Sequence, residues 1–298
     1  MKIFEFIKLN NIFKNLLILI PFLVAGGNID PESLLIFGEA FIIFFLLTSC
    51  CYIINNYTDR KIDKINKLKK NKYFPEKKEL FTIFFIFFIL FFLSVFYFNS
   101  FNNYFIYIYI LNFIFYNFYF KHIFLIDILL LTNFYLIRLL YGIQIFDLDF
   151  SSGFFIFFFS IFLCLSIGKR IIQINVNELI KENKIIPYST KNKLYLKKFF
   201  LIFLGINYLI FLIFFIENLD FIFFDTNFFF NIKDYSNLEI IFLLIFYSLL
   251  VLRLFFFISN DLIKKDIYEH LLKDKITILL LIFTIIILIF NYLPVKFV

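Results

Sequence analysis

The chain has 298 residues, of which 62% are hydrophobic, and a mean hydropathy of +0.92. These values exclude an ordinary soluble domain, which is about 45–50% apolar and must keep a polar surface. The formal net charge is +7, but most lysines and arginines lie between long apolar runs, so membrane topology explains them better than nucleic-acid binding does. Three cysteines and two histidines disfavour a zinc, haem or copper site and a disulfide framework.

Nine apolar runs predict nine transmembrane helices, since a helical span needs roughly 20 apolar residues. The runs lie near residues 12–27, 34–54, 80–98, 101–119, 123–141, 153–168, 197–217, 237–257 and 275–293. The first and sixth runs are short, as a tilted, kinked or partly re-entrant segment would be. We therefore expect an all-α, multi-pass transmembrane bundle that forms a single domain over residues 1–298.

The basic residues predict the orientation of these spans. With the N-terminus inside, the inner segments carry 25 of the 29 lysines and arginines, and the outer segments carry 2. The other two, Arg138 and Arg253, lie within spans. We expect a protein of the plasma membrane with a cytoplasmic N-terminus and an external C-terminus. Its two long inner loops would be residues 55–79 and 169–195.

The second span runs directly into Asn55, Asp59 and Asp63, which are spaced four residues apart. At 3.6 residues per turn, this spacing places the three side chains on one helical face, where neighbouring carboxylates repel each other. A divalent cation would cancel that repulsion. Carboxylate and amide oxygens suit Mg²⁺, whose coordination is usually completed by substrate phosphates and water. The alternative is a solvated helix end whose acids pair with nearby lysines.

Two cationic stretches follow predicted spans. The first, which includes Lys72, either grips phosphates or lies against anionic lipid headgroups. The second begins with Gly168, Lys169 and Arg170 at the predicted end of the sixth span. A glycine at a helix end leaves backbone amides available for an anion, and the two cations would add fixed charge. The alternative is a positively charged cap of that span.

Three ionisable residues lie inside predicted spans: Asp127, Arg138 and Arg253. Charges inside a membrane are costly and usually face the interior of a bundle. These residues are therefore candidates for supporting a polar site. For both arginines, a side chain that reaches the membrane surface is an equally good account.

The order and spacing of these segments resemble the UbiA prenyltransferase superfamily, in particular its decaprenyl-phosphate phosphoribosyltransferase branch. The pattern Asn55-x3-Asp59-x3-Asp63 is similar to the first aspartate-rich motif of the superfamily, which also has nine helices with the active face inside. The segments similar to the phosphoribosyltransferase branch are Phe13–Leu17, Lys121–Asp127, Arg138–Gly142, Ser166–Arg170, Tyr188–Ser189, Arg253 and Lys273–Lys275.

Three positions depart from the pattern of that family. Asn56 stands where an aspartate is common, and Lys72 stands where relatives have an arginine, whose bidentate phosphate geometry a lysine lacks. Gln173 replaces an acidic residue that follows the Gly-Lys-Arg triplet. These departures bear on the substrate more than on the fold.

The resemblance implies a transferase in which Asn55, Asp59 and Asp63 hold Mg²⁺ against a diphosphate leaving group. In the phosphoribosyl branch, the phosphate of a polyprenyl lipid attacks the anomeric carbon of phosphoribosyl diphosphate. Two phosphorylated substrates would need several fixed cations. The candidate phosphate-binding residues are Lys14, Lys72, Lys169, Arg170 and Tyr188.

Two other functions stay open. Aromatic prenyltransferases of quinone or haem pathways use a polyprenyl diphosphate and usually carry a second DxxxD motif in the second long loop. Residues 169–195 contain no Asp, and their only acids are Glu178 and Glu182, which are four residues apart and leave a weak carboxylate pair as an alternative. The lack of aspartates favours phosphoribosyl transfer. A non-enzymatic transporter or scaffold would more often show broken helices near the midplane and internal repeats.

Overall fold

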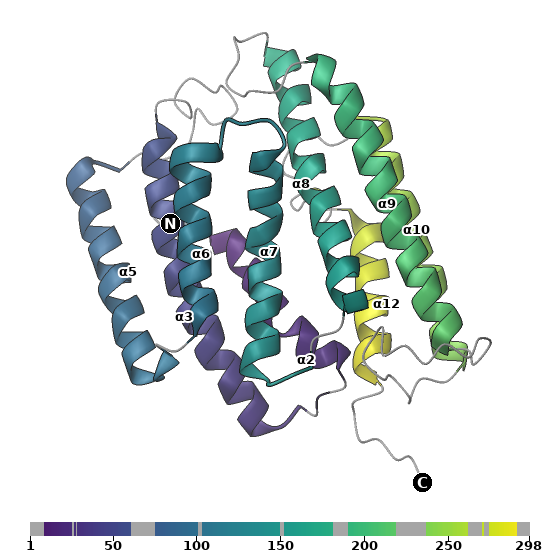
Figure 1. The fold of residues 1–298 in the computed structure, drawn as a ribbon, viewed down its shortest axis with the longest axis horizontal. Helices are drawn as coiled ribbons and strands as arrows, with labels where there is room; N and C mark the ends of the chain where they lie inside the picture. Colours follow the sequence, from purple (N-terminus) through teal and green to yellow (C-terminus); the bar gives the residue numbers. More distant parts are fainter. Residues whose placement is uncertain are drawn as a thin grey trace. The chain divides into compact units, whose positions relative to one another are not determined.

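The computed structural model of the protein describes residues 9–25, 27, 29–60, 75–100, 103–149, 152–180, 190–218, 237–261, 270 and 274–290. Within these ranges the regular secondary structure is helical. In chain order the segments are η1 (Leu9–Ile18), α2 (Ile20–Val24), α3 (Pro31–Thr58), α5 (Lys77–Tyr97), α6 (Tyr104–Ile114), η4 (Phe115–Phe120), α7 (Ile126–Ile145), α8 (Ser152–Ile180), α9 (Thr190–Asn218), α10 (Asn237–Ser259) and α12 (Lys275–Phe290) (Figure 1).

Each of the nine predicted spans coincides with a helical segment in the described ranges. Six helices, α3, α5, α7, α8, α9 and α10, contain stretches long and apolar enough to cross a membrane. Three shorter apolar helices occupy the other predicted spans, at Phe13–Val24, Tyr104–Phe120 and Lys275–Thr284. The prediction of an all-α, multi-pass membrane protein is confirmed.

The first predicted span is not one α-helix. It consists of the 3-10 helix η1 and the five-residue α-helix α2, which are separated at Leu19. Pro21 lies in the first turn of α2, where its missing N–H is not needed for a helical hydrogen bond. The first predicted span is therefore interrupted at Leu19.

The sixth predicted span ends too early, because α8 continues without interruption to Ile180. Gly168, Lys169 and Arg170 thus lie inside the helix, and the predicted helix end at Gly168 is wrong. The reason is visible in the packing of the added turns. Ile171, Ile172 and Ile174 are 1%, 5% and 2% exposed, so this part of α8 contributes an apolar face to the core.

The chain forms two compact units. The first comprises Met1–Pro21, Ile29–Lys121 and Asn133–Leu148, and the second comprises Phe22–Asn28, His122–Thr132 and Asp149–Val298. Each unit has its own buried apolar cluster among the described residues. The single domain expected over residues 1–298 stays a prediction.

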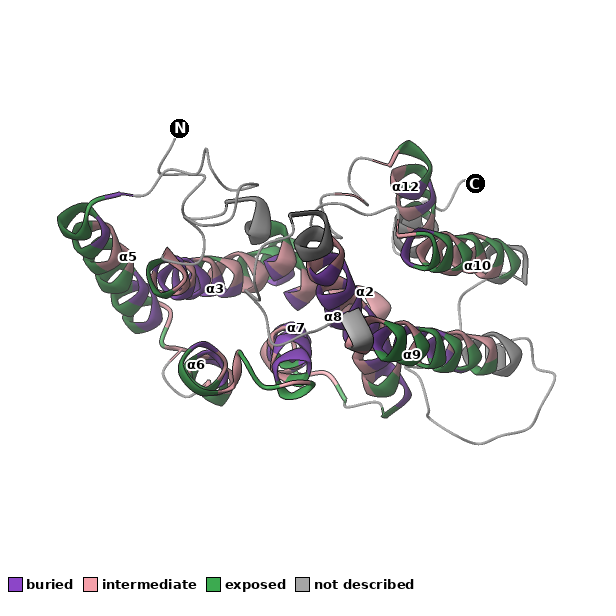
Figure 2. Ribbon diagram, turned by 90° about the horizontal axis from the view of Figure 1, so that it is seen from above, coloured by how far each residue is buried: buried purple, intermediate pink, exposed green. Residues whose placement is uncertain are grey.

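Helix α3 is the central helix of the first unit. Asp30 caps its start, since the carboxylate accepts from Ser33 N at 2.7 Å and Ser33 Oγ accepts from Asp30 N at 3.1 Å. The Phe44 ring packs against the rings of Tyr109 and Tyr141, at centroid distances of 5.5 Å and 4.6 Å. Figure 2 shows many buried positions on α3 and mostly exposed ones on α5, as expected where α5 faces lipid.

Close packing joins α7 to η1 in the same unit. A Cβ atom added at Gly142 would lie 2.1 Å from the backbone oxygen of Ile18, far inside contact distance. Only glycine allows this approach of the two backbones. The approach fixes η1 against the part of α7 that belongs to the first unit.

Helices α8 and α9 form the core of the second unit. Ile171, Leu196 and Phe200 are at most 1% exposed and belong to one apolar cluster. A polar link crosses the apolar contact at Asn207, whose Nδ2 donates to Phe157 O at 2.9 Å and to Ser160 Oγ at 3.0 Å. Its Oδ1 accepts from the Tyr247 hydroxyl of α10. Asn207 is fully buried, so these bonds satisfy an amide that would otherwise be costly within the unit.

Candidate functional site

The end of α3 carries a cluster of polar atoms that converge on one ammonium group. Lys121 Nζ lies 2.6 Å from each carboxylate oxygen of Asp59 and 2.9 Å from Oδ1 of Asn55. Asp59 is the C-cap of α3, one turn beyond Asn55, so both side chains lie on one helical face, as their spacing predicts. Asp59 is 22% exposed and Lys121 is 17% exposed. The cluster is therefore half-buried, with access from outside.

A π-helical segment brings Lys121 to this position. Helix α6 widens into η4 over Phe115–Phe120, and Lys121 follows directly. Within η4, the buried Asn117 accepts a hydrogen bond from Thr58 Oγ1 at 3.1 Å, which holds the segment to the last turn of α3. The ring of Tyr116 lies 5.7 Å from Lys121 Nζ, within reach of a cation–π contact. Single π-turns of this kind occur often at functional sites.

The donor set of this cluster fits a divalent cation. Asn55 and Asp59 already direct three oxygens at one positive group, the Lys121 ammonium, which acts as a stand-in cation. One carboxylate with an amide oxygen is a sparse set, which suits Mg²⁺ because this ion usually takes its other ligands from phosphates and water. Among the described residues, no three His, Cys, Asp or Glu side chains gather into a closed metal site. The third predicted ligand, Asp63, lies outside the described residues, as do Lys72 and Tyr188.

A second charged pair lies in the second unit. Arg170 Nε of α8 is 2.5 Å from Asp127 Oδ2 in the first turn of α7. The Arg170 side chain is 5% exposed and that of Asp127 is not exposed at all. Arg170 Nη1 also donates a hydrogen bond to the amide oxygen of Gln173, one turn further along α8. The Gln173 amide thus meets the arginine at the position where the family pattern has an acid.

The ion pair with Asp127 changes how readily Arg170 can bind a phosphate. A guanidinium bound to a buried carboxylate is less available to a phosphate than a free one, so its phosphate-binding role stays a prediction. Asp127 holds this arginine in place, and its supporting role at the site stays a prediction. Lys169, the adjacent residue, is partly exposed. It is the more accessible cation of the Gly-Lys-Arg triplet.

Arg138 occupies a buried network in the first unit. It is 2% exposed, and its guanidinium donates to Asn15 Oδ1 at 2.9 Å, Phe134 O at 2.5 Å and the Tyr109 hydroxyl at 3.0 Å. A side chain directed to the membrane surface is therefore wrong for this residue. Asn15 Nδ2 continues the network to Thr48 Oγ1 at 3.5 Å, so Arg138 ties η1, α3, α6 and α7 together. Intramembrane arginines that face a bundle interior are expected to be held in this way.

Lys14 lies next to this network, on η1. Its Nζ is 5.7 Å from the centre of the Tyr135 ring of α7, and its side chain is partly exposed. A partly exposed lysine on this interrupted first segment is compatible with the predicted phosphate-binding role, which stays a prediction. The contact with Tyr135 restricts where the ammonium can reach.

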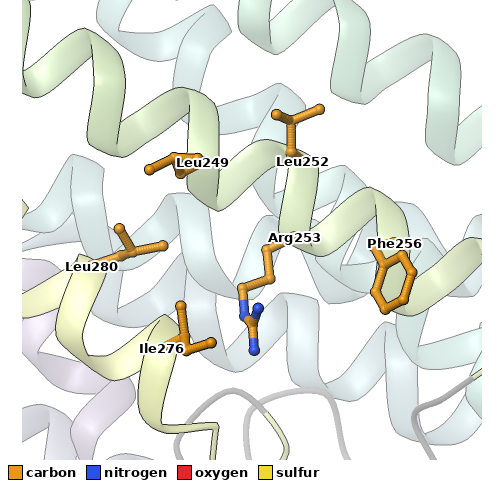
Figure 3. A pocket seen from close by; sticks show the side chains of 6 residues that line it. All are labelled: Leu249, Leu252, Arg253, Phe256, Ile276 and Leu280. Atoms are coloured by element: carbon orange, nitrogen blue, oxygen red, sulfur yellow. The ribbon is translucent and has the colours of Figure 1, made fainter.

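Arg253 pairs with an acid at the start of α12. Its Nε and Nη2 donate to the two carboxylate oxygens of Asp274 at 2.6 Å and 2.5 Å, and Nε also donates to Thr277 Oγ1 at 3.1 Å. The hydrogen bonds from Arg253 hold the pKa of the Asp274 carboxyl well below its ordinary value, although partial burial opposes them. Figure 3 shows Arg253 reaching from α10 beside Ile276 in a groove otherwise lined by apolar side chains. This geometry describes a brace between α10 and α12 within the second unit, and a supporting role of Arg253 at the site stays a prediction.

The sequence did not predict two charged clusters, one around Lys121 and one around Asp261. The sequence placed Lys121 on the inner side and in the Lys121–Asp127 segment but gave it no role in the site, because its partners lie 62 and 66 residues earlier. Lys193 and Lys197 were assigned to topology, but both pair with Asp261, at 3.1 Å and 2.9 Å, and Asn175 Nδ2 donates to the same carboxylate at 2.9 Å. Burial of Asp261 raises its pKa, but the hydrogen bonds from Lys197, Asn175 and Lys193 outweigh this and hold the pKa below its ordinary value.

Comparison with known proteins agrees with the helical fold. The chain resembles a solved structure of digeranylgeranylglyceryl phosphate synthase with a TM-score of 0.59 and 17% sequence identity, over 97% of this chain and 95% of that one. At this identity the similarity establishes the fold alone. No curated protein sequence matches the chain significantly. The model of the UbiA prenyltransferase family matches residues 16–169, slightly more than half of the chain, and the protein therefore belongs to this family of membrane transferases.

Proposed function

We propose that this protein transfers 5-phosphoribose from phosphoribosyl diphosphate to a polyprenyl phosphate. An oxygen of the lipid phosphate forms a bond to the anomeric carbon, and the bond from that carbon to diphosphate breaks. The observation that carries the proposal is the convergence of Asn55 and Asp59 oxygens on one cation position at the end of α3. Such a position favours a reaction in which a negatively charged diphosphate departs.

The metal-binding part of the proposal assigns Asn55, Asp59 and Asp63 as Mg²⁺ ligands. Bound Mg²⁺ would neutralise the charge that builds up on the leaving diphosphate. The protein itself would hold the ligand oxygens in place before the substrate arrives. The α3 backbone sets Asn55 and Asp59 one turn apart, and the hydrogen bond from Thr58 to Asn117 stabilises that end of the helix.

The phosphate-binding part of the proposal assigns Lys14, Lys72, Lys169, Arg170 and Tyr188. Two phosphorylated substrates carry more negative charge than one, so a site with several cations suits phosphoribosyl transfer. Lys14 and Lys169 are partly exposed and could approach a phosphate directly. Arg170 would act through the orientation that Asp127 and Gln173 give it. The positively charged inner loops favour a cytoplasmic site, where a water-soluble sugar phosphate would arrive.

The second half of the chain favours phosphoribosyl transfer over transfer to an aromatic ring. Aromatic prenyltransferases are expected to present a second pair of aspartates here, whereas residues 169–195 contain no Asp. In the structure, α8 extends to Ile180, and Gln173 lies beside Arg170 where a carboxylate would stand in the family pattern. A neutral amide at that point supplies no carboxylate ligand for a second metal-bound diphosphate.

The test compares substrate pairs with the purified protein in liposomes containing Mg²⁺. We expect diphosphate release from phosphoribosyl diphosphate only when polyprenyl phosphate is present. Asp59→Asn should abolish it, and Asp149→Asn, which changes an exposed acid outside the cluster, should not. Release that requires a polyprenyl diphosphate and an aromatic acceptor would overturn the phosphoribosyl assignment and keep the metal assignment. If neither substrate pair gives diphosphate release, both the phosphoribosyl assignment and the metal assignment are overturned.

A further inference from the structure

Lys121 contacts the same oxygens that the proposed metal would use. Its ammonium makes three short contacts, two to Asp59 and one to Asn55, at 2.6, 2.6 and 2.9 Å. An ammonium in this position supplies the positive charge that Asp59 requires at the end of a membrane helix. It also fills the point on which the ligand oxygens converge.

A divalent ion and this ammonium cannot share the cluster. Metal–oxygen distances for Mg²⁺ are about 2.0–2.1 Å, so an ion bound to Asn55 and Asp59 would lie where Lys121 Nζ now lies. Two like charges at such a distance repel strongly, especially in a half-buried site. One cation must therefore leave when the other binds.

The surroundings of Lys121 allow it to leave. Its side chain is 17% exposed, and among the described residues its ammonium also lies near the Tyr116 ring, 5.7 Å from Nζ. A lysine has a long flexible stem and a single point charge, so it can exchange partners more easily than the rigid fork of an arginine. The aromatic face of Tyr116 offers the ammonium a neighbouring favourable position.

We propose that Lys121 is a built-in counter-ion of the Asn55–Asp59 cluster, which a divalent metal must displace in order to bind. The inference rests on the metal site of the proposed function. It makes metal binding an exchange of cations, in which the Asp59 carboxylate keeps a positive partner in both states. Metal affinity is then set by competition with Lys121 as well as by the ligands themselves.

The first test measures Mn²⁺ binding to the purified protein by electron paramagnetic resonance, with no substrate present. Lys121→Met removes the competing charge and keeps much of the side-chain volume, so the Kd for Mn²⁺ should fall at least about tenfold. Lys121→Gln, which keeps a polar head, should behave likewise. Lys197→Met breaks another lysine–aspartate contact, with Asp261, and should leave Mn²⁺ binding unchanged.

The second measurement labels the folded protein with an acetylating reagent. The acetylation of Lys121 is then measured by mass spectrometry of the digested peptides. Mg²⁺ should increase the labelling rate of Lys121 severalfold, because the displaced ammonium becomes accessible. Lys78, exposed at the start of α5, provides the internal reference and should not respond. Asp59→Asn should increase labelling of Lys121 without any metal.

The outcomes separate this inference from the proposed function. If Lys121→Met weakens Mn²⁺ binding or leaves it unchanged, or if Mg²⁺ slows acetylation of Lys121, the counter-ion role is wrong. The metal site still stands in that case, provided that Asp59→Asn abolishes Mn²⁺ binding. If Asp59→Asn binds Mn²⁺ as tightly as the natural protein does, or if no variant binds it, both proposals fall together.

Discussion

Two pairs of opposite charges differ in what surrounds them. In the first unit, Asp59 and Lys121 keep 22% and 17% of their side-chain surface exposed, whereas in the second unit Asp127 and Arg170 keep 0% and 5%. The first pair joins a carboxylate to a flexible lysine at a helix end, and the second joins a carboxylate to an arginine inside a packed core. Exposure and the choice of cation decide whether a partner can be exchanged.

The difference follows from the cost of separating charges. A half-exposed pair contributes little net stability, since water solvates either partner when they part. A buried pair holds its partners together, because removing one of them leaves a charge without solvent or counter-charge. We therefore assign ligand exchange to the Asp59 pair and positioning to the Asp127 pair, and mutations can break that distinction.

The largest effect on stability is expected from Asp127→Ala. The change removes the negative charge beside a guanidinium that is 5% exposed, and breaking such a pair costs about 3–5 kcal/mol. Thermal unfolding in detergent should show a clear fall in Tm. The double variant Asp127→Leu with Arg170→Met, which removes both charges, should recover much of the loss. A single variant as stable as the natural protein would contradict a positioning role.

Asp59→Asn should show the opposite profile. We expect a loss of transferase activity of at least about 100-fold, the size typical for removal of one group that stabilises developing charge. Stability should change by only about 0–1 kcal/mol, because the pair is half-exposed. Initial rates and thermal unfolding on the same preparation measure both quantities. An equally large fall in Tm would show that the contact with Lys121 is mainly structural.

The sequence predicted the helices far better than the contacts between charges. Long apolar runs are sufficient to locate membrane spans, and each predicted span coincides with a helical segment. Hydropathy marks where a helix leaves the membrane, however, and not where it ends. For this reason the continuation of α8 past Gly168 was missed, although Ile171 and Ile174 carry its buried face.

The candidate site was predicted as far as local spacing could show it. Asn55 and Asp59 lie on one face because they are four residues apart, which any helix guarantees. Lys121 approaches them only through the packing of η4 against the end of α3, over a separation of 62 residues from Asp59. The pairing of Arg170 with Asp127 also depends on packing between helices. A single sequence contains no direct signal for such contacts.

A packing variant tests whether the stability of the first unit depends more on close backbone contacts than on the pair of Asp59 with Lys121. Gly142→Ala would place a Cβ 2.1 Å from the backbone oxygen of Ile18, and overpacking of this kind costs about 1–3 kcal/mol. Gly38→Ala in α3 is the matched control, since nothing lies within 4 Å of its added Cβ. Thermal unfolding should show a lower Tm for the first variant and an unchanged or slightly raised Tm for the second. Equal behaviour of the two would contradict the close approach of α7 to η1.

The smallest effect is expected at Asp274, whose pair with Arg253 is more exposed than either of the other two pairs. Arg253 is 25% exposed and Asp274 is 19% exposed, so the pair should contribute about 1 kcal/mol or less. Because the folded protein lowers the pKa of Asp274, this contribution is fully present above the ordinary pKa near 3.9 and declines as the pH falls below it. The Tm of Asp274→Asn should thus lie slightly below that of the natural protein at pH 7, and the gap should narrow toward pH 3. A gap that widened on acidification would mean that the carboxylate is not stabilised by Arg253. A gap as large as that of Asp127→Ala would mean that exposure does not set the strength of these pairs.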